Sequence, residues 1–189
     1  MKHFKMVSIV VAALCLTGFL GGTAKAEREH AKDIAALAGV KTSLVQAIGT
    51  VEQQNGGKAV KADIREKDGT PVYVITTQSG GKESKTLVDP ASGSILETSQ
   101  KGFLRRLFDD DASEHAGINT SKLTRGAAVT MAEQQVGGKA IEAGFKDKHG
   151  KSRFEIDLVK DGASQEIVID GTSGQVIKTK IHEDEGDDD

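Results

Sequence analysis

Apolar residues follow two different periods along this chain, one helical and one strand-like. Between residues 44 and 51 they recur four and then three positions apart, which places them on one face of a helix. Between residues 60 and 64 they alternate with charged residues, as in a strand with one buried face. The pattern therefore predicts a helix that is followed by a half-buried strand.

Glycine-containing turns follow this strand and separate further short apolar segments. The Asp-Gly at 68–69 and the Gly-Gly at 80–81 are typical of hairpin turns. The segment 89–93 combines aspartate, proline, serine and glycine, which favours a tight turn. Three more strands are predicted between and after these turns, around residues 73–75, 87–88 and 95–96.

This series of elements occurs twice in the sequence. Residues 44–100 reappear without a gap as residues 125–181. The Glu-Gln-Gln at 52–54, for example, returns at 133–135, an offset of 81 positions that the other shared landmarks keep. A constant offset over separated landmarks indicates one duplicated structural unit.

Residues that favour helix ends flank both helical segments. Ser43 is a good N-cap, and Gln46 stands three positions later, as in a capping box. Thr124 takes the same place before the second helix. Asn55-Gly56-Gly57 and Gly137-Gly138 are predicted to end the two helices, because glycine tolerates the left-handed backbone that closes a helix.

We therefore predict an α+β protein of two repeated modules, each with one helix packed on a small antiparallel sheet of three to four strands. Module 1 is expected over residues 43–100 and module 2 over residues 120–182. The polar segment at 76–78 predicts a shorter sheet in module 1. A unit of roughly 60 residues is marginally stable alone, so we expect the modules to pack on each other or on a partner.

Residues 1–26 have the pattern of a secretory signal peptide. A basic start precedes a short apolar run at 6–20, and Ala24-Lys25-Ala26 provides a cleavage signal. The alternative is a retained membrane anchor. Cleavage would remove the only cysteine, Cys15, and leave no stable membrane span, so we expect a periplasmic or secreted protein without disulfides.

Three further segments lie outside the modules. Residues 27–42 are expected to form a leader, and residues 183–189 an acidic disordered tail. Residues 101–119 form a linker that could contain a short amphipathic helix. Three interpretations stay open for this linker: a connector that docks on a sheet, an exposed helix that binds a partner, and contact with a membrane surface.

The charge balance argues against nucleic-acid binding. The chain has a formal net charge of −3, and removal of residues 1–26 would take away three lysines and no acid. Six acids lie in the tail, so the body before the tail is close to neutral. A nucleic-acid-binding protein usually shows a basic surface, which this composition does not provide.

Two sets of landmarks resemble the PepSY domain family. They are Gly56-Gly57-Lys58 with the turn at 89–93, and Gly137-Gly138-Lys139 with the turn at 170–174. The resemblance covers both modules. Domains of this family occur in the propeptides of secreted metallopeptidases and in small exported proteins, and they are thought to regulate or inhibit peptidases or to bind peptides. The resemblance therefore implies an exported, non-enzymatic protein whose partner is a protein or peptide, such as an exported peptidase or a receptor's sensor domain.

The sequence offers no catalytic or cofactor-binding motif. Its Gly-Gly-Lys segments lack the spacing of a phosphate-binding loop. No Gly-x-Ser-x-Gly segment is present for a serine hydrolase. The segment at 182–186 has glycine where a zinc peptidase helix carries its second histidine. We therefore expect no enzyme, no catalytic residue and no cofactor.

The alternative function is that of a metal-binding or metal-responsive envelope protein. Carboxylate oxygens suit divalent cations such as calcium, and a nearby imidazole suits zinc or copper. The candidate ligands form two clusters. One contains Asp109, Asp110, Asp111, Glu114 and His115, and the other contains His182, Glu183, Asp184, Glu185, Asp187, Asp188 and Asp189. Neither cluster has the spacing of an EF-hand loop, so solvated acidic runs are the other interpretation.

For the binding function, we predict that an extended peptide is taken up by strand addition at the edge or face of a sheet. The contacts are expected on the second strand of each module. The candidate residues are Val72, Val74, Thr76, Arg153, Glu155 and Asp157.

Overall fold

The computed structural model describes residues 37, 39–100, 118 and 121–182, which form two helices and eight strands. The elements of module 1 are α2 (Leu44–Asn55), β1 (Lys58–Lys67), β2 (Thr70–Ser79), β3 (Lys82–Val88) and β4 (Ile95–Gln100). Those of module 2 are α5 (Arg125–Val136), β5 (Lys139–Lys148), β6 (Lys151–Lys160), β7 (Ala163–Asp170) and β8 (Val176–His182). The same order of elements in both modules agrees with the repeat in the sequence.

Both helices begin and end at the residues that the sequence predicts. The Ser43 hydroxyl accepts a hydrogen bond from the backbone of Gln46 at 3.2 Å, and the Gln46 side chain accepts one from the backbone of Ser43 at 2.9 Å. Thr124 caps α5 in the same way at 3.2 Å. Gly56 and Gly137 close the helices with φ angles of 66° and 77°. The predicted capping box and glycine ends are confirmed.

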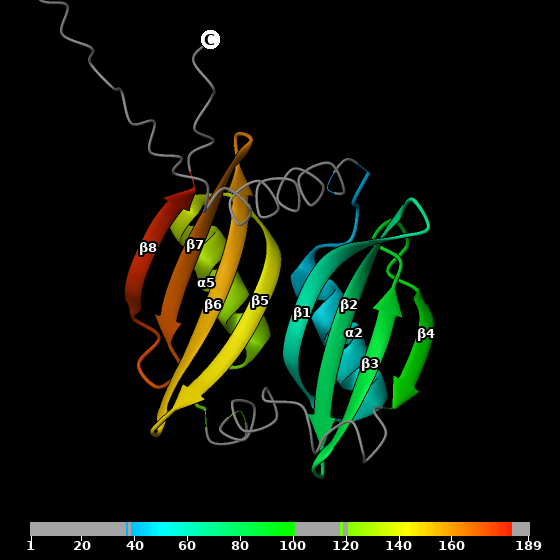
Figure 1. Cartoon of the computed structure of the whole chain (residues 1–189), viewed down its shortest axis with the longest axis horizontal. Helices are drawn as coiled ribbons and strands as arrows, with labels where there is room; N and C mark the ends of the chain where they lie inside the picture. Colours follow the sequence, from blue (N-terminus) through cyan, green and yellow to red (C-terminus); the bar gives the residue numbers. More distant parts are fainter. Residues whose placement is uncertain (1–36, 38, 101–117, 119–120, 183–189) are drawn as a thin grey trace, which may run out of the picture.

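The eight described strands form one antiparallel sheet, in the order β4-β3-β2-β1-β5-β6-β7-β8. The prediction of a separate small sheet in each module is therefore wrong. Each module contributes four strands, and β1 pairs with β5 at the centre (Figure 1). Without this pairing, β1 and β5 would each leave a row of backbone donors and acceptors unpaired.

The central pairing relates the modules by an approximate twofold axis. Ala62 lies opposite Ala143, which is its own equivalent 81 positions later. Asp63 lies opposite Glu142, and Glu142 is the equivalent of Lys61. The contact is isologous, because each module presents the same strand positions to the other.

Both helices cover one face of the sheet and pack beside each other (Figure 1). α2 buries Leu44, Ala47, Ile48 and Val51 against the strands. The buried apolar cluster continues from module 1 into module 2 without a break. The two modules are therefore stabilised by one shared core, as we expected for units too small to be stable alone.

The polar end of β2 does not shorten this strand. The neighbouring strands β3 and β4 have 7 and 6 residues, against 8 and 7 in β7 and β8. β2 and β6 have 10 residues each. Thr77 is buried on the α2 side, where the Asn55 amide donates hydrogen bonds to Thr77 at 3.4 Å and to Thr86 at 3.0 Å. Buried hydroxyls are tolerated in a strand when they have such partners.

Several predicted segments lie wholly or largely outside the described residues. They are the signal peptide (1–26), the leader (27–42, described only at 37 and 39–42), the linker (101–119, described only at 118) and the tail (183–189). The backbone amides of Lys41 and Thr42 donate to the carbonyl of Pro90 at 3.1 Å and 2.9 Å, so the end of the leader packs on module 1. Neither described helix is long and apolar enough to cross a membrane.

Candidate functional site

The candidate binding surface is the face of the sheet opposite the helices, which we call the open face. Side chains alternate between the two faces of a strand. On β2, Tyr73 and Ile75 are buried in the core under α2. Val72, Val74 and Thr76 therefore lie on the open face.

β6 follows the same alternation. Phe154 and Ile156 are fully buried in the core, which leaves Arg153, Glu155 and Asp157 on the open face. The six predicted partner-binding residues thus share one surface. β2 and β6 are inner strands, however, and each is paired on both sides. Their main chains cannot accept an added strand, so the predicted contact is left to their side chains.

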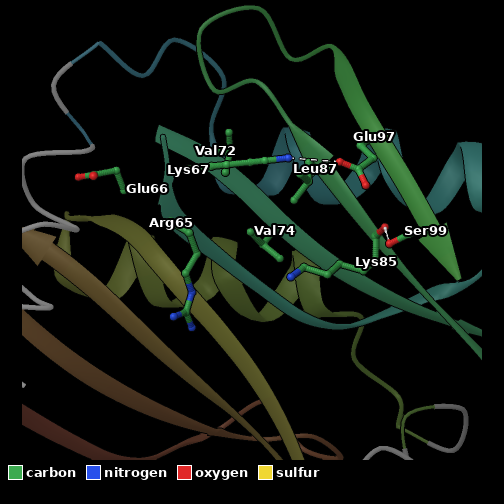
Figure 2. Close-up of a pocket in the computed structure, with 9 residues that line it drawn as sticks. All are labelled: Arg65, Glu66, Lys67, Val72, Val74, Lys85, Leu87, Glu97 and Ser99. Carbon is green, nitrogen blue, oxygen red and sulfur yellow. Dashed lines mark hydrogen bonds and ion pairs between the residues drawn. The ribbon is translucent and has the colours of Figure 1, made fainter. Parts of the chain in front are cut away.

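The open face of module 1 contains a hollow with a volume of about 390 Å³ (Figure 2). Its apolar part is formed by the buried Val72 and the half-buried Val74 and Leu87. The other lining residues are Arg65, Glu66, Lys67, Lys85, Glu97 and Ser99. We call these nine residues the module 1 hollow, which draws on β1, β2, β3 and β4.

The charged residues of the hollow are only partly paired with each other. Lys67 forms an ion pair with Glu97 at 3.3 Å. Arg65 pairs with Asp63 at 2.7 Å. Lys85 forms no ion pair with any described residue, and Figure 2 shows its side chain beside Val74. The hollow therefore combines an aliphatic floor with an unpaired cation.

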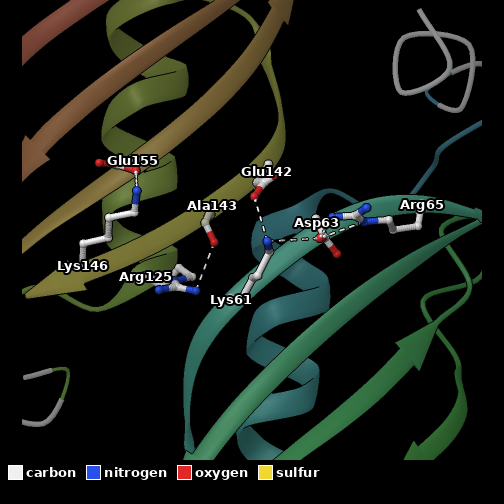
Figure 3. A network of polar contacts seen from close by, with 8 residues as sticks. All are labelled: Lys61, Asp63, Arg65, Arg125, Glu142, Ala143, Lys146 and Glu155. Carbon is white, nitrogen blue, oxygen red and sulfur yellow. Dashed lines mark hydrogen bonds and ion pairs between the residues drawn. The ribbon is translucent and has the colours of Figure 1, made fainter. Parts of the chain in front are cut away.

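Asp63 joins the hollow to module 2 through a polar network (Figure 3). Arg65 donates two hydrogen bonds to one Asp63 oxygen, at 3.0 Å and 2.7 Å. Lys61 lies 3.9 Å from the same oxygen and 3.2 Å from Glu142 of module 2. Burial raises the pKa of the Asp63 carboxyl, and the hydrogen bond from Arg65 opposes this effect. The network thus holds a buried carboxylate at the junction of the modules.

The open face of module 2 has a different character at the equivalent positions. Arg153 and Glu155 stand where module 1 has Val72 and Val74. Glu155 forms ion pairs with Lys146 at 2.9 Å and with Arg153 at 3.1 Å. A further ion pair joins β7 to β8 at 3.3 Å. Module 2 therefore presents charges that pair with each other where module 1 presents an aliphatic floor.

Of the candidate metal ligands, only His182 lies among the described residues. Asp109, Asp110, Asp111, Glu114, His115 and Glu183 lie outside the described residues. His182 is the last residue of β8. Among the residues that the structure describes, no group of three or more His, Cys, Asp or Glu side chains is placed to hold a metal ion.

Sequence reasoning missed part of the hollow. Arg65, Lys85 and Leu87 come from β1 and β3, whereas the sequence directed attention to the second strand of each module. A position-by-position comparison of the two modules could have found the difference. Val74 against Glu155 and Lys85 against Glu166 are the clearest contrasts, because equivalent open-face positions carry different chemistry.

Comparison with protein families gives one match. A family model described as "Peptidase propeptide and YPEB domain", abbreviated PepSY, matches residues 27–98 and 122–180. These ranges include both of the described helices and most of the described strand residues. No curated protein matches the chain.

Several solved structures are similar at low sequence identity. A Clostridium difficile 630 protein described as a lipoprotein is 17% identical, with 76% of this chain and 95% of that chain covered and a TM-score of 0.47. The C-terminal domain of Bacillus megaterium YpeB is 16% identical, with 80% and 66% covered and a TM-score of 0.30. A BLIP-like protein of Bacteroides fragilis is 16% identical, with 74% and 89% covered and a TM-score of 0.27.

Proposed function

The chain belongs to the PepSY family, and from this premise we propose that it is an exported, non-enzymatic protein that binds a peptide or protein partner. The family is associated with peptidase propeptides and with YpeB. The partner we propose is an exported peptidase or the extracytoplasmic part of a signalling receptor, which this protein inhibits or regulates. The signal-peptide pattern of residues 1–26 supports a periplasmic or secreted location.

The observation that carries the proposal is the contrast between two equivalent surfaces. In module 2, the charges at 153 and 155 are paired with each other and with a neighbouring lysine. In module 1, the same positions are valines at the floor of a hollow. An apolar floor gains free energy when a partner displaces its water, whereas ion pairs that are already formed gain little. We therefore place the contact on module 1.

The lining of the hollow indicates the chemistry of its occupant. Val72, Val74 and Leu87 suit an aliphatic side chain. Lys85 has no carboxylate partner among the described residues and suits an acidic group next to that side chain. An extended segment with an aliphatic residue beside an acidic one fits both features. In this arrangement the side chains of the open face select the segment.

The experiment compares two variants of the chain that starts at Glu27. Val74→Glu places in module 1 the residue that module 2 carries, and Glu155→Gln removes the charge at the equivalent position. Proteins are captured from an envelope extract, and the affinity of the identified partner is then measured by calorimetry.

We expect Val74→Glu to weaken binding of the partner at least about tenfold, which corresponds to about 1.4 kcal/mol. The new carboxylate removes an aliphatic contact and competes with the acidic group of the partner for Lys85. Glu155→Gln should leave the affinity unchanged. Circular dichroism checks that both variants keep the fold. If Val74→Glu leaves the affinity unchanged and Glu155→Gln abolishes binding, the contact lies on module 2 and the proposal is refuted.

A further inference from the structure

The approximate twofold axis relates each position of module 2 to an equivalent position in module 1. At one pair of equivalent positions the two modules carry very different side chains. Arg125, the first residue of α5, is 1% exposed and lies in the core. Its equivalent in module 1 is Leu44, the first residue of α2. A long cationic side chain and a short aliphatic one thus occupy corresponding places.

Arg125 is held by three features of its surroundings. One guanidinium nitrogen donates a hydrogen bond to the carbonyl of Ala143 at 3.0 Å (Figure 3). The guanidinium carbon lies 5.9 Å from the centroid of the Phe154 ring, within the range of a cation–π contact. Burial lowers the pKa of Arg125 to about 9, and the negative charges of Glu52 and Glu142 oppose this effect. The surroundings of Arg125 therefore show how a guanidinium group is accommodated at the start of α5.

A cavity of about 250 Å³ is found in the counterpart of these surroundings. Its lining includes Leu44, Tyr73 and Glu133, which are the equivalents of Arg125, Phe154 and Glu52. The lining also includes Leu37, Val40, Lys41, Ser43, Gln46, Gly138, Lys139 and Ala140. We call this space the inter-module cavity, because it lies between the start of α2 and the end of α5. Leu44 has a shorter side chain than its arginine counterpart, and the cavity lies beside it.

The carboxylate of the cavity is fixed in the same manner as its counterpart. Glu133 accepts a hydrogen bond from the backbone of Ala140 at 3.1 Å, and Glu52 accepts one from the backbone of Ala59 at 2.8 Å. The pKa of Tyr73 is raised to about 12, mainly by burial and to a smaller extent by the charge of Glu133. An aromatic ring and a carboxylate therefore lie close together in the cavity, as they do around Arg125.

We propose that the inter-module cavity binds the guanidinium group of an arginine residue from another polypeptide. The group would stack on Tyr73 and lie within the influence of the Glu133 charge, as Arg125 lies near the Phe154 ring and within the influence of the Glu52 charge. The cavity is smaller than the usual pocket for a drug-sized ligand, which begins at about 300 Å³, and this size suits a single side chain. The site lies on the helix side of the sheet and does not depend on the open face.

Two lysines line the cavity, and they do not exclude a cation. Lys41 and Lys139 are both exposed. Module 2 also has lysines at the equivalent positions, Lys122 and Lys58, and it holds Arg125 in its core. Because long lysine side chains keep their charged ends in water, the deeper carboxylate decides which charge the cavity favours.

The test uses the chain that starts at Glu27 and three capped tripeptides, Gly-Arg-Gly, Gly-Lys-Gly and a version with citrulline, which has nearly the shape of arginine but no charge. Binding is followed by calorimetry and by the NMR signals of the Tyr73 ring. We expect the arginine peptide to bind at least tenfold more tightly than the other two and to shift the Tyr73 signals. Equal binding of the arginine and citrulline peptides, or no binding of either, would refute the proposal.

Three variants locate the site. Glu133→Gln should weaken the arginine peptide at least tenfold, and Leu44→Arg should abolish binding by filling the cavity from within. Arg125→Leu opens the counterpart and should raise the stoichiometry from one peptide to two. Unchanged binding in Glu133→Gln would overturn the proposal even if Leu44→Arg fails to fold. The guanidinium ion alone should bind more weakly than the peptide, and equal binding would refute a polypeptide as the source.

Discussion

Ala62 on β1 lies directly opposite Ala143 on β5, and the two residues occupy the same position in their modules. Around this pair, Lys61 faces Gly144 and Asp63 faces Glu142. Two carboxylates are thus directly opposite each other, which is unfavourable in a sheet. Lys61 offsets this repulsion by pairing with Glu142 at 3.2 Å.

The same register predicts that module 1 alone forms a dimer. If two copies of residues 37–100 pair through β1 with Ala62 at the centre, Lys61 of each copy faces Asp63 of the other. Each such opposite-charge pair contributes about 0.2–1 kcal/mol, and the pairing also removes an exposed edge. Sedimentation equilibrium should show a dimer. The Asp63→Lys variant places lysines opposite each other across the pairing, so this fragment should remain monomeric. A folded monomer of the unmodified fragment would contradict the prediction.

Gly57 and Gly138 are predicted to resist substitution by alanine. A Cβ atom at Gly57 would lie 2.8 Å from the carbonyl oxygen of Gln78, and one at Gly138 would lie 2.7 Å from that of Val159. The backbone would have to move, at a cost of about 1–3 kcal/mol in the free energy of unfolding. Urea denaturation measures this loss for Gly57→Ala and Gly138→Ala.

Gly49 is the matched control for these two positions. It lies inside α2, and no atom is found within 4 Å of the place of an added Cβ. Gly49→Ala should therefore stabilise the protein by about 0.5–1 kcal/mol, because alanine loses less backbone entropy in a helix. If Gly49→Ala and Gly57→Ala lower the free energy of unfolding equally, the close approach at Gly57 is not the cause of the loss.

Tyr73 is predicted to titrate far above a free tyrosine. Burial, together with the charge of Glu133, raises its pKa from 10.0 to about 12. Between these values the unfolded chain loses the phenolic proton while the folded chain keeps it, so stability falls as the pH rises through this window. Tyr73 is the only tyrosine, and its ultraviolet absorbance reports the titration without interference. A Tyr73→Phe variant should lack this part of the alkaline loss, and a midpoint near 10 in the folded protein would show that the ring is exposed to water.

Arg125→Met is predicted to stabilise the protein at neutral pH. Two nitrogens of Arg125 have no hydrogen-bond partner among the described residues, and replacing a buried charge by an apolar side chain often gains about 1–4 kcal/mol. The advantage should shrink with rising pH. The pKa of Arg125 is lowered from 12.5 to about 9, so from pH 9 upward the folded wild type can release a proton that its unfolded chain retains. Denaturation of both proteins at neutral and alkaline pH checks the sign, and a difference that widens with pH would contradict it.

Local features of the fold could be predicted from the sequence because they depend on neighbouring residues. The capping box of Ser43 and Gln46 and the left-handed glycines are examples, and all were found. The single sheet was not predicted, because the alternating pattern of β1 is the same for an edge strand and an inner one. Only the small Ala62 and Ala143 at the junction hint at a close central pairing.

The candidate site was predicted less completely for a related reason. The sequence directed attention to the second strand of each module, but a hollow requires residues from several strands. The partner of the polar stretch at 76–78, Asn55, is distant in sequence and meets it only in the fold. The binding role of the second-strand residues stays a prediction.

Because the two modules belong to one chain, equivalent positions in them can carry different residues. In an assembly of two identical chains, every substitution is made twice, so a new charge or a new gap appears on both sides of the axis. Here the aliphatic Leu44 corresponds to Arg125, and the apolar Val74 corresponds to Glu155. A single chain that carries both modules can therefore place a different surface on each half.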